Sequence, residues 1–269
     1  MNDLFNRLFN RQPPKVICGD YYYGTDVDGD QFDECDRQRW LINQFKDYWM
    51  YKQAESVEHA EMFNEIRRLF SDVSAPFLEI ACGPGMGLAP IVLGSNPGLS
   101  CLSTDACSML IEAWREYIDK NLCDYNISLA QFSVMDMPLI DEAFENVTSF
   151  IGVSSTRAGK EGQLKALREI HRVLKNGGRF VTVESDGWAD IEAVKKVYAS
   201  WETPRWKPYD DEPAETWKEK FIKCGFEVEA CDKSYYHKWD SGDNEFGEQA
   251  ERAGIEIGTT TTLYVLRKI

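Results

Sequence analysis

The chain has 269 residues, which suits one α/β domain with an added cap better than two full domains. Apolar residues make up 43% of it, enough for a hydrophobic core, which excludes a disordered chain. The formal net charge is −15 and no run rich in Lys or Arg occurs, which argues against nucleic acid and anionic membranes as partners.

The first 72 residues read as a helical N-terminal cap or lid. The opening "MNDLFNRLFN" predicts one or two helical turns that dock on the chain's own domain, and Pro13 ends them. Residues 33–71 have a helical pattern, with Ser56 as an N-cap. Apolar residues then follow at helical spacing, namely Val57, Ala60, Phe63, Ile66 and Phe70.

From residue 73 to 269 we expect the core domain, in which short apolar runs alternate with helical stretches. The strands are predicted at 77–81, 99–104, 127–134, 147–153 and 179–184, and the helices at 86–93, 106–119 and 161–174. This alternation predicts a parallel sheet with helices on both faces. Helices are also expected at 189–201 and 214–224, and two final strands, 226–237 and 260–268, flank an acidic loop as a plausible antiparallel pair.

A glycine-rich loop, "LEIACGPGMG", follows the first strand of the core. Gly83, Gly85 and Gly87 allow the backbone to approach a ligand closely. No Lys follows Gly87, so the loop is not a mononucleotide P-loop. The third glycine stands at 87 rather than 88, so the spacing also departs from the dinucleotide fingerprint.

Three acidic residues stand near strand ends. Glu79 lies four residues before Gly83, where a carboxylate favours a cationic ligand over a phosphate. Asp105 lies 18 residues after Gly87, where it can accept both hydroxyls of a ribose. Asp136 follows the third strand, where it can accept from an adenine amino group. This set suits S-adenosylmethionine.

Residues 76–184 resemble the class I S-adenosylmethionine-dependent methyltransferases. The resemblance rests on "LEIACGPGMG", "STDACSML", "FSVMDMPLIDEAF" and "LREIHRVLKNGGRFVTVE", in order and at the family's spacing. It implies a Rossmann-like, doubly wound sheet of seven strands, mostly parallel with the last strand antiparallel. One departure is Ala81, which stands where the family usually has its first glycine.

The resemblance also implies the cofactor and its site. The donor would be S-adenosyl-L-methionine and the product S-adenosyl-L-homocysteine. The implied cofactor-binding residues are Glu79, Ala81, Gly83, Gly85, Asp105, Ala106, Asp136, Met137 and Gly152.

The function expected is therefore methyl transfer to a small-molecule acceptor. The alternatives are a protein or peptide methyltransferase and a non-catalytic partner subunit of the same fold. The sequence leaves open the acceptor, its atom, the use of a general base and the oligomeric state. Glu184, Asp186 and His237 are the candidate catalytic bases.

The acceptor pocket is expected between the cap and an aromatic-rich lid insertion at 186–213. Tyr22 and Tyr23 of the cap and Trp188 and Trp206 of the lid are the candidate substrate-binding residues. Aromatic side chains at these places would favour an apolar, planar or cationic acceptor.

Metal chemistry is not expected. The eight cysteines form no C-x-x-C pair, and only three histidines are present, so we interpret the cysteines as reduced thiols of a cytoplasmic protein without a signal peptide or membrane span. Residues 26–34, "DVDGDQFDE", match a calcium loop only in part and are interpreted as an acidic surface turn. His171 is interpreted as a structural side chain.

Overall fold

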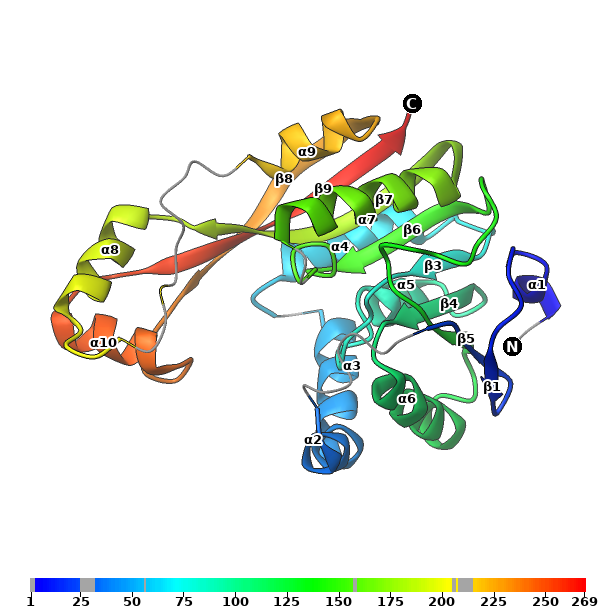
Figure 1. The fold of residues 1–269 in the computed structure, drawn as a ribbon, viewed down its shortest axis with the longest axis horizontal. Helices are drawn as coiled ribbons and strands as arrows, with labels where there is room; N and C mark the ends of the chain where they lie inside the picture. The colour runs from blue at the N-terminus through cyan, green and yellow to red at the C-terminus, as the bar shows by residue number, and fades with distance from the viewer. Residues whose placement is uncertain (1–2, 25–31, 56, 157–158, 205–206, 208–214) are drawn as a thin grey trace.

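The structure, a computed structural model, describes residues 3–24, 32–55, 57–156, 159–204, 207 and 215–269. One sheet of nine strands runs through the described residues in the order β1-β2-β5-β4-β3-β6-β7-β9-β8 (Figure 1). The strands are β1 Lys15–Ile17, β2 Asp20–Tyr22, β3 Phe77–Glu79, β4 Ser100–Asp105, β5 Asn126–Gln131, β6 Phe144–Phe150, β7 Leu174–Trp188, β8 Phe226–Lys238 and β9 Gly258–Lys268.

The central strands run parallel, as the sequence predicts. β3 pairs in parallel with both β4 and β6, and β7 pairs in parallel with β6. The last strand, β9, is antiparallel to β7 and to β8. The predicted α/β fold with a reversed last strand is therefore confirmed.

The predicted number of seven strands is wrong, because β1 and β2 form a hairpin that joins the edge of the sheet. β2 pairs in parallel with β5. The hairpin turns at Cys18 and Gly19, whose φ angles of 49° and 85° are those of a two-residue primed turn. Both strands lie within the segment predicted to be a helical cap, and such short strands carry little sequence signal.

Helices cover both faces of the sheet (Figure 1). One apolar core packs α3, α4, α5 and α6 against one face, and a second packs α1, α7 and α9 against the other. The helices are α1 Asp3–Asn6, α2 Glu34–Arg39, the π-helical turn η1 Trp40–Gln44, α3 Phe45–Gln53, α4 Ala60–Phe70, α5 Ala89–Ser95, α6 Ser108–Asn121, α7 Gly159–Val173, α8 Ile191–Ser200, α9 Trp217–Lys223 and α10 Glu245–Ala253.

Two predictions for the N-terminal segment can be compared with the structure. Phe63, Ile66 and Phe70 are fully buried along one face of α4, as their spacing predicts. Phe5 of α1 is also fully buried and stacks on Phe144, with ring centroids 6.3 Å apart, so the opening turn docks on its own domain. Ser56, the predicted N-cap, lies outside the described residues.

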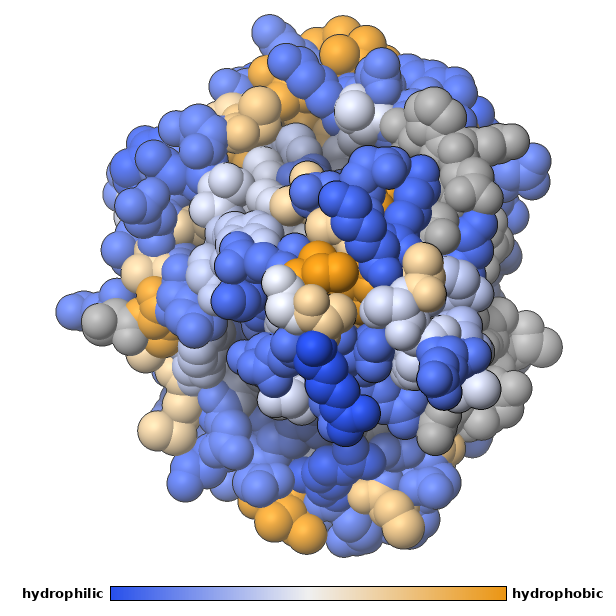
Figure 2. All heavy atoms as spheres, turned by 90° about the vertical axis from the view of Figure 1, so that its left-hand side faces the viewer, coloured by the Kyte–Doolittle hydropathy of each residue, from blue (hydrophilic) through white to orange (hydrophobic). Residues whose placement is uncertain are grey.

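The distal ends of β7, β8 and β9 carry α8 and α10 as a unit that extends from the sheet (Figure 1). Its own apolar cluster contains Trp188, Val194, Val197, Trp201, Trp239, Phe246, Ala250 and Ile257. The outward face of this unit is mostly hydrophilic, and its apolar side chains occur in small separate groups (Figure 2).

The sequence prediction of an acidic loop at α10 is wrong. The Asn244 side chain caps the helix by accepting from the backbone N–H groups of Phe246 and Gly247, and Gly254 ends it with φ 65°. Phe246 and Ala250 lie one turn apart and are both buried. The apolar spacing of α10 is present in the sequence. The many acidic residues around it led to the prediction of a loop.

None of the described helices combines the length and the apolarity that crossing a bilayer requires. All eight cysteines lie in the described part of the chain, and all are free thiols.

Phe246→Ala should test whether the apolar cluster of this distal unit stabilises it. Removal of a fully buried ring should lower the free energy of unfolding of the unit by about 3–5 kcal/mol. Urea titration should show this loss, and Ile222→Ala, at a side chain that is 58% exposed, should show almost none. Equal losses in both variants would contradict the description of the cluster.

Candidate functional site

A cavity of about 900 Å³ opens at the carboxyl ends of β3, β4, β5 and β6, where open α/β sheets bind their ligands. One wall comes from the loops that follow these strands, and it includes Ala81, Gly83, Gly85, Asp105, Ala106, Ser133 and Gly152. The opposite wall comes from the N-terminal segment and includes Phe32, Tyr48, Tyr51, Lys52 and His59.

The glycine loop between β3 and α5 is a tightly folded backbone segment. Ala81, Gly83, Met86 and Gly87 all have φ angles between 48° and 55°, the left-handed region. Gly87 N–H donates to Cys82 O at 2.7 Å, which closes the loop on itself. Ala81 replaces a glycine of the resembling family, and the left-handed φ explains why glycine is usual there, since a Cβ costs roughly 1–2 kcal/mol.

Glu79 lies beneath this loop rather than on the cavity wall. Its Oε2 accepts from the Leu88 N–H at 3.0 Å and from the Thr148 hydroxyl at 2.6 Å. The side chain is fully buried, and burial raises the pKa of its carboxyl. The described residues that line the cavity do not include Glu79. Its contacts therefore hold the loop, and an attraction between Glu79 and a bound cation stays a prediction.

Lys52 of α3 contacts the loop from the other side, and sequence reasoning missed it. Its Nζ donates to Gly85 O at 2.8 Å and to Gly87 O. It also lies 4.7 Å from the centroid of the Phe150 ring. The side chain is buried, and burial lowers the pKa of the ammonium. The sequence signal that could have identified Lys52 is its position three residues after Trp49, on the face of α3 that is buried.

Asp105, at the end of β4, lines the cavity beside Ala106. Its Oδ2 accepts from Gly83 N–H and its Oδ1 from Cys107 N–H, each at 2.9 Å. The carboxylate thus links the glycine loop to the start of α6. The structure places six of the nine predicted cofactor-binding residues on the cavity wall, namely Ala81, Gly83, Gly85, Asp105, Ala106 and Gly152.

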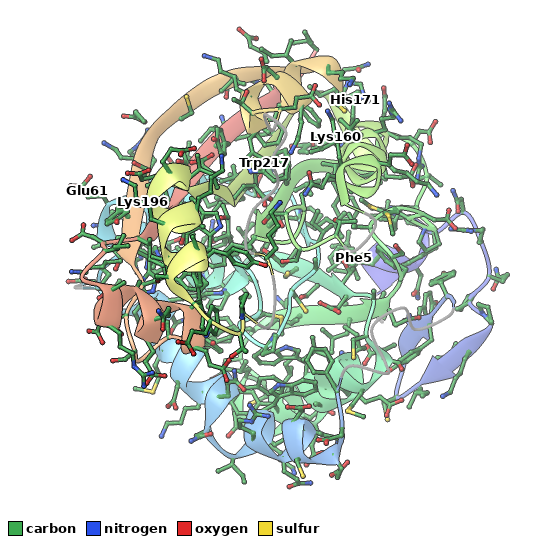
Figure 3. The ribbon with its side chains drawn as sticks, turned by 60° about the vertical axis from the view of Figure 1, so that its left-hand side comes forward. Phe5, Glu61, Lys160, His171, Lys196 and Trp217 are labelled. Atoms are coloured by element: carbon green, nitrogen blue, oxygen red, sulfur yellow. The ribbon has the colours of Figure 1, made fainter. Side chains whose placement is uncertain are left out.

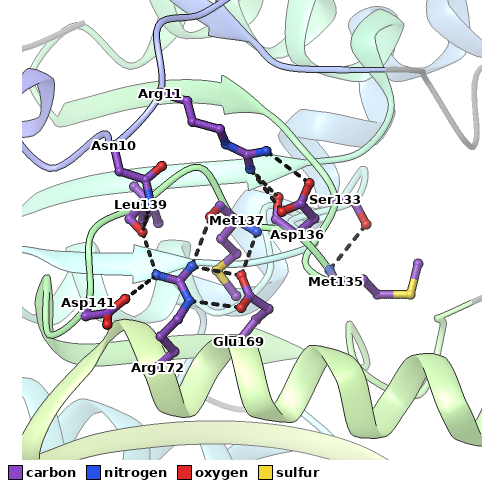
Figure 4. A network of polar contacts seen from close by, with 10 residues as sticks. All are labelled: Asn10, Arg11, Ser133, Met135, Asp136, Met137, Leu139, Asp141, Glu169 and Arg172. Atoms are coloured by element: carbon purple, nitrogen blue, oxygen red, sulfur yellow. Dashed lines mark hydrogen bonds and ion pairs between the residues drawn. The ribbon is translucent and has the colours of Figure 1, made fainter.

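Asp136 and Met137 are not among the described residues that line the cavity, and both belong to a network of polar contacts (Figure 4). Asp136 is exposed and pairs with Arg11 at 3.1 Å. Met137 is buried, and its N–H donates to Glu169 at 2.9 Å. β5 ends at Gln131 rather than at the predicted residue 134, so the rim residue is Ser133 instead.

The three candidate bases also lie outside the described lining of the cavity. Glu184 is fully buried and accepts from Ser154 N–H at 2.9 Å and from the Thr182 hydroxyl at 2.7 Å. Asp186 accepts from the hydroxyls of Tyr264 and Thr262. His237 on β8 pairs with Asp243 at 2.9 Å.

The predicted substrate-binding aromatics are likewise placed elsewhere. Tyr22 is buried in the sheet, and Tyr23 stacks on Phe9 with ring centroids 5.4 Å apart. Trp188 packs in the distal cluster, 4.9 Å from Trp239. The described lining of the cavity includes none of these three. Trp206 lies outside the described residues.

The acidic turn and His171, which the sequence also singled out, have structural roles in the described part of the chain. Asp33 caps α2 by accepting from Cys35 N–H at 2.8 Å, whereas residues 26–31 of the acidic turn lie outside the described residues. No group of side chains suited to holding a metal ion occurs in the described part of the chain. His171 on α7 (labelled in Figure 3) packs edge-on against Phe226 with ring centroids 5.3 Å apart, as its structural interpretation expects.

Two polar side chains on the cavity wall were missed by sequence reasoning. The hydroxyl of Tyr51 and Nδ1 of His59 are 2.8 Å apart, and both side chains line the cavity. Neither belongs to a motif, and His59 was passed over as part of a helical pattern. Their pairing requires the chain to turn between α3 and α4, which no local signal reveals.

Comparison with known proteins agrees with this geometry. Residues 78–182 match the family model of a methyltransferase domain. The demethylmenaquinone methyltransferase of Staphylococcus aureus strain JH9 is 27% identical over 122 residues, which cover 45% of this chain and 47% of that protein. The match thus spans about half the length of this relative.

Two solved structures share the fold. The YcgJ protein from Bacillus subtilis superposes with a TM-score of 0.55 at 17% identity, over 78% of this chain and 99% of that one. A SAM-dependent methyltransferase from Methanosarcina mazei gives a TM-score of 0.52 at 15% identity, over 76% and 97%. Residues 78–182 therefore match a methyltransferase domain, and the two solved structures show that the chain has the fold of such proteins.

Gly87→Ala should disrupt the glycine loop. The new Cβ would meet the Glu79 carboxylate and would have to adopt a φ of 53°, a strain of at least about 1–2 kcal/mol. Thermal melts should show the loss of stability. Gly98→Ala is the matched control, because its nearest neighbour, Asn96 Oδ1, is 3.9 Å from the added Cβ. A Gly87→Ala protein as stable as Gly98→Ala would refute this view of the loop.

Lys52→Met should remove the contact between α3 and the glycine loop while keeping most of the side-chain volume. The carbonyls of Gly85 and Gly87 would lose a charged donor, so we expect a loss of about 1.5–3 kcal/mol in the free energy of unfolding. Lys46→Met on the exposed face of the same helix should change stability little. Chemical denaturation of both variants measures the difference.

Proposed function

We propose that this chain is an S-adenosylmethionine-dependent methyltransferase that acts on a small molecule. The observation that carries the proposal is the cavity, which brings the glycine loop, Asp105 and Gly152 of a methyltransferase domain together with an aromatic wall from another part of the chain. S-adenosyl-L-methionine is the donor in this proposal, and S-adenosyl-L-homocysteine is its product.

The cofactor would lie along the wall formed by the sheet loops. Asp105 would accept from the ribose hydroxyls, because its carboxylate lines the cavity at the end of β4. The backbone from Ala81 to Gly85 would border the methionine portion, and Ser133 would stand at the adenine end in place of Asp136.

The acceptor would lie against the wall formed by Phe32, Tyr48, Tyr51 and His59. A volume of about 900 Å³ is at the upper end of the range for small-molecule sites, which leaves room for a cofactor and a compact acceptor together. The apolar surroundings exclude water and hold the two reactants in line, which is the main requirement of a direct methyl displacement.

Two alternatives remain distinguishable by experiment. A peptide methyltransferase would need the acceptor side to admit an extended chain, whereas here α3 and His59 border the cavity on that side. A non-catalytic partner subunit would bind no cofactor or transfer no methyl group from it. The relative named above is a demethylmenaquinone methyltransferase, and its name thus gives a small molecule as the acceptor.

Calorimetry with S-adenosylmethionine, S-adenosylhomocysteine, NAD and ATP tests the cofactor directly. We expect the first two to bind and the last two to bind much more weakly, because the loop lacks the phosphate-binding patterns. A screen of a metabolite library for methylation then identifies the acceptor. NAD binding as tight as that of S-adenosylmethionine would contradict the proposal.

Asp105→Ala should weaken S-adenosylmethionine binding by roughly 2–4 kcal/mol, the scale of lost charge-assisted hydrogen bonds. Asp136→Ala is the matched control, because the Asp136 side chain is 67% exposed and pairs with Arg11. Its affinity should stay unchanged when measured by the same calorimetry. The reverse order of effects would restore Asp136 as the adenine contact.

A further inference from the structure

We propose that Tyr51 and His59 form a proton-accepting pair in this cavity, and that the methyl acceptor is a neutral planar molecule that reacts through a ring hydroxyl of the phenol class. This inference rests on the proposed function and extends it to the acceptor atom. Its basis is the position of the two side chains and the bond between them.

The two residues meet at the turn between α3 and α4. Tyr51 lies in the last turn of α3, and His59 directly precedes α4. The Tyr51 hydroxyl is 2.8 Å from Nδ1 of His59, and both half-buried side chains line the cavity. The pair thus faces the same space as the glycine loop and Asp105.

The proposal assigns a direction to this bond. The Tyr51 hydroxyl lies 2.8 Å from Nδ1 of His59, and in the proposal it donates its proton to Nδ1. Neutral His59 then carries its own proton on Nε2. In this arrangement the Tyr51 oxygen can accept a proton from a ligand as its own proton passes to Nδ1.

The imidazole is held by aromatic rings on several sides. It stacks on Phe63 with centroids 5.6 Å apart, and it lies 6.4 Å from Phe150 and 4.3 Å from Tyr235. These contacts fix the orientation of the ring without supplying another proton acceptor at Nδ1. A fixed base is a requirement for efficient proton transfer.

The charges around the pair keep both members neutral near pH 7. Burial lowers the pKa of His59 below its ordinary value, and His237 and Lys52 lower it further, whereas Glu58 opposes this. Burial raises the pKa of Tyr51, and Glu58 raises it further. A neutral imidazole can therefore accept a proton when the enzyme meets its acceptor.

Other titratable groups in the described lining have other roles in this proposal. The Lys52 ammonium donates to two loop carbonyls, and Asp105 faces the ribose of the cofactor. Cys82 is buried, and burial raises the pKa of its thiol, while Tyr48 is 42% exposed. The Tyr51 and His59 pair joins two side chains of this lining by a hydrogen bond, through which a proton can be received and passed on.

The chemical step balances within the site. The acceptor O–H bond breaks and its proton moves to the Tyr51 oxygen, while the Tyr51 proton moves to His59 Nδ1. The acceptor oxygen forms a bond to the methyl carbon, and the bond from that carbon to sulfur breaks with its electron pair left on sulfur. The positive charge of the sulfonium is thus replaced by that of the imidazolium, which later loses its proton to water.

The class of acceptor follows from this base and these walls. A neutral imidazole is a weak base, so it suits a phenolic hydroxyl far better than an aliphatic alcohol, whose proton is much harder to remove. The rings of Phe32, Tyr51 and Phe150 on the wall suit a flat apolar molecule.

The test uses 4-nitrophenol as the probe, because its ionised form absorbs visible light and the neutral form does not. With S-adenosylhomocysteine bound, the wild-type protein at pH 6 should take up the probe and raise its phenolate fraction several-fold. His59→Gln and Tyr51→Phe should bind S-adenosylhomocysteine normally by calorimetry but lose this rise. Histidine NMR of the wild type should show one imidazolium formed on probe binding.

His171→Gln and Tyr236→Phe are the matched controls, since the described lining of the cavity includes neither residue. Both should keep the full phenolate signal. No bound phenolate in the wild type, or an equal signal in His59→Gln, would overturn the pair while leaving the cofactor assignment intact. Absence of S-adenosylhomocysteine binding would overturn the proposed function and this inference together.

Discussion

The buried ammonium of Lys52 ties the two halves of the site together. It comes from α3 of the N-terminal segment and donates to the carbonyls of Gly85 and Gly87, in the loop that follows β3. A charge withdrawn from water is stable only with such partners, so α3 and the loop hold each other in place. Glu79, buried on the other side of the loop, binds the start of α5 and the β6 strand through Leu88 and Thr148.

This arrangement allows unfavourable backbone angles to persist at the cavity. Ala81 and Ile151 both line it and have φ angles of 48° and 59°, and for a β-branched residue such an angle is a true outlier. Each is fixed by its surroundings, since Ile151 N–H donates to Val183 O at 2.7 Å. Strain of this kind is typical of ligand sites whose framework is rigid.

The site combines a part shared with other methyltransferases and a part that belongs to this chain. The matched family segment, residues 78–182, contains the glycine loop, Asp105 and Gly152. Tyr51, Lys52 and His59 all precede it. In our proposal the donor therefore binds to the residues of this domain, whereas the residues that select the acceptor come from the N-terminal segment.

Local patterns in the sequence predicted the central strands, the helix containing Phe63, Ile66 and Phe70, and the loop of Gly83, Gly85 and Gly87, because each depends on residues close together in the chain. The same patterns contained the caps of α10, which were overlooked. Local patterns could not place Asp136. The predicted end of β5 was three residues too late, and such a shift changes which side chain lines the cavity. The pairing of Tyr51 with His59 and of Lys52 with the loop was decided only by the tertiary structure, since these contacts join segments whose approach depends on how α3 and α4 pack on the sheet.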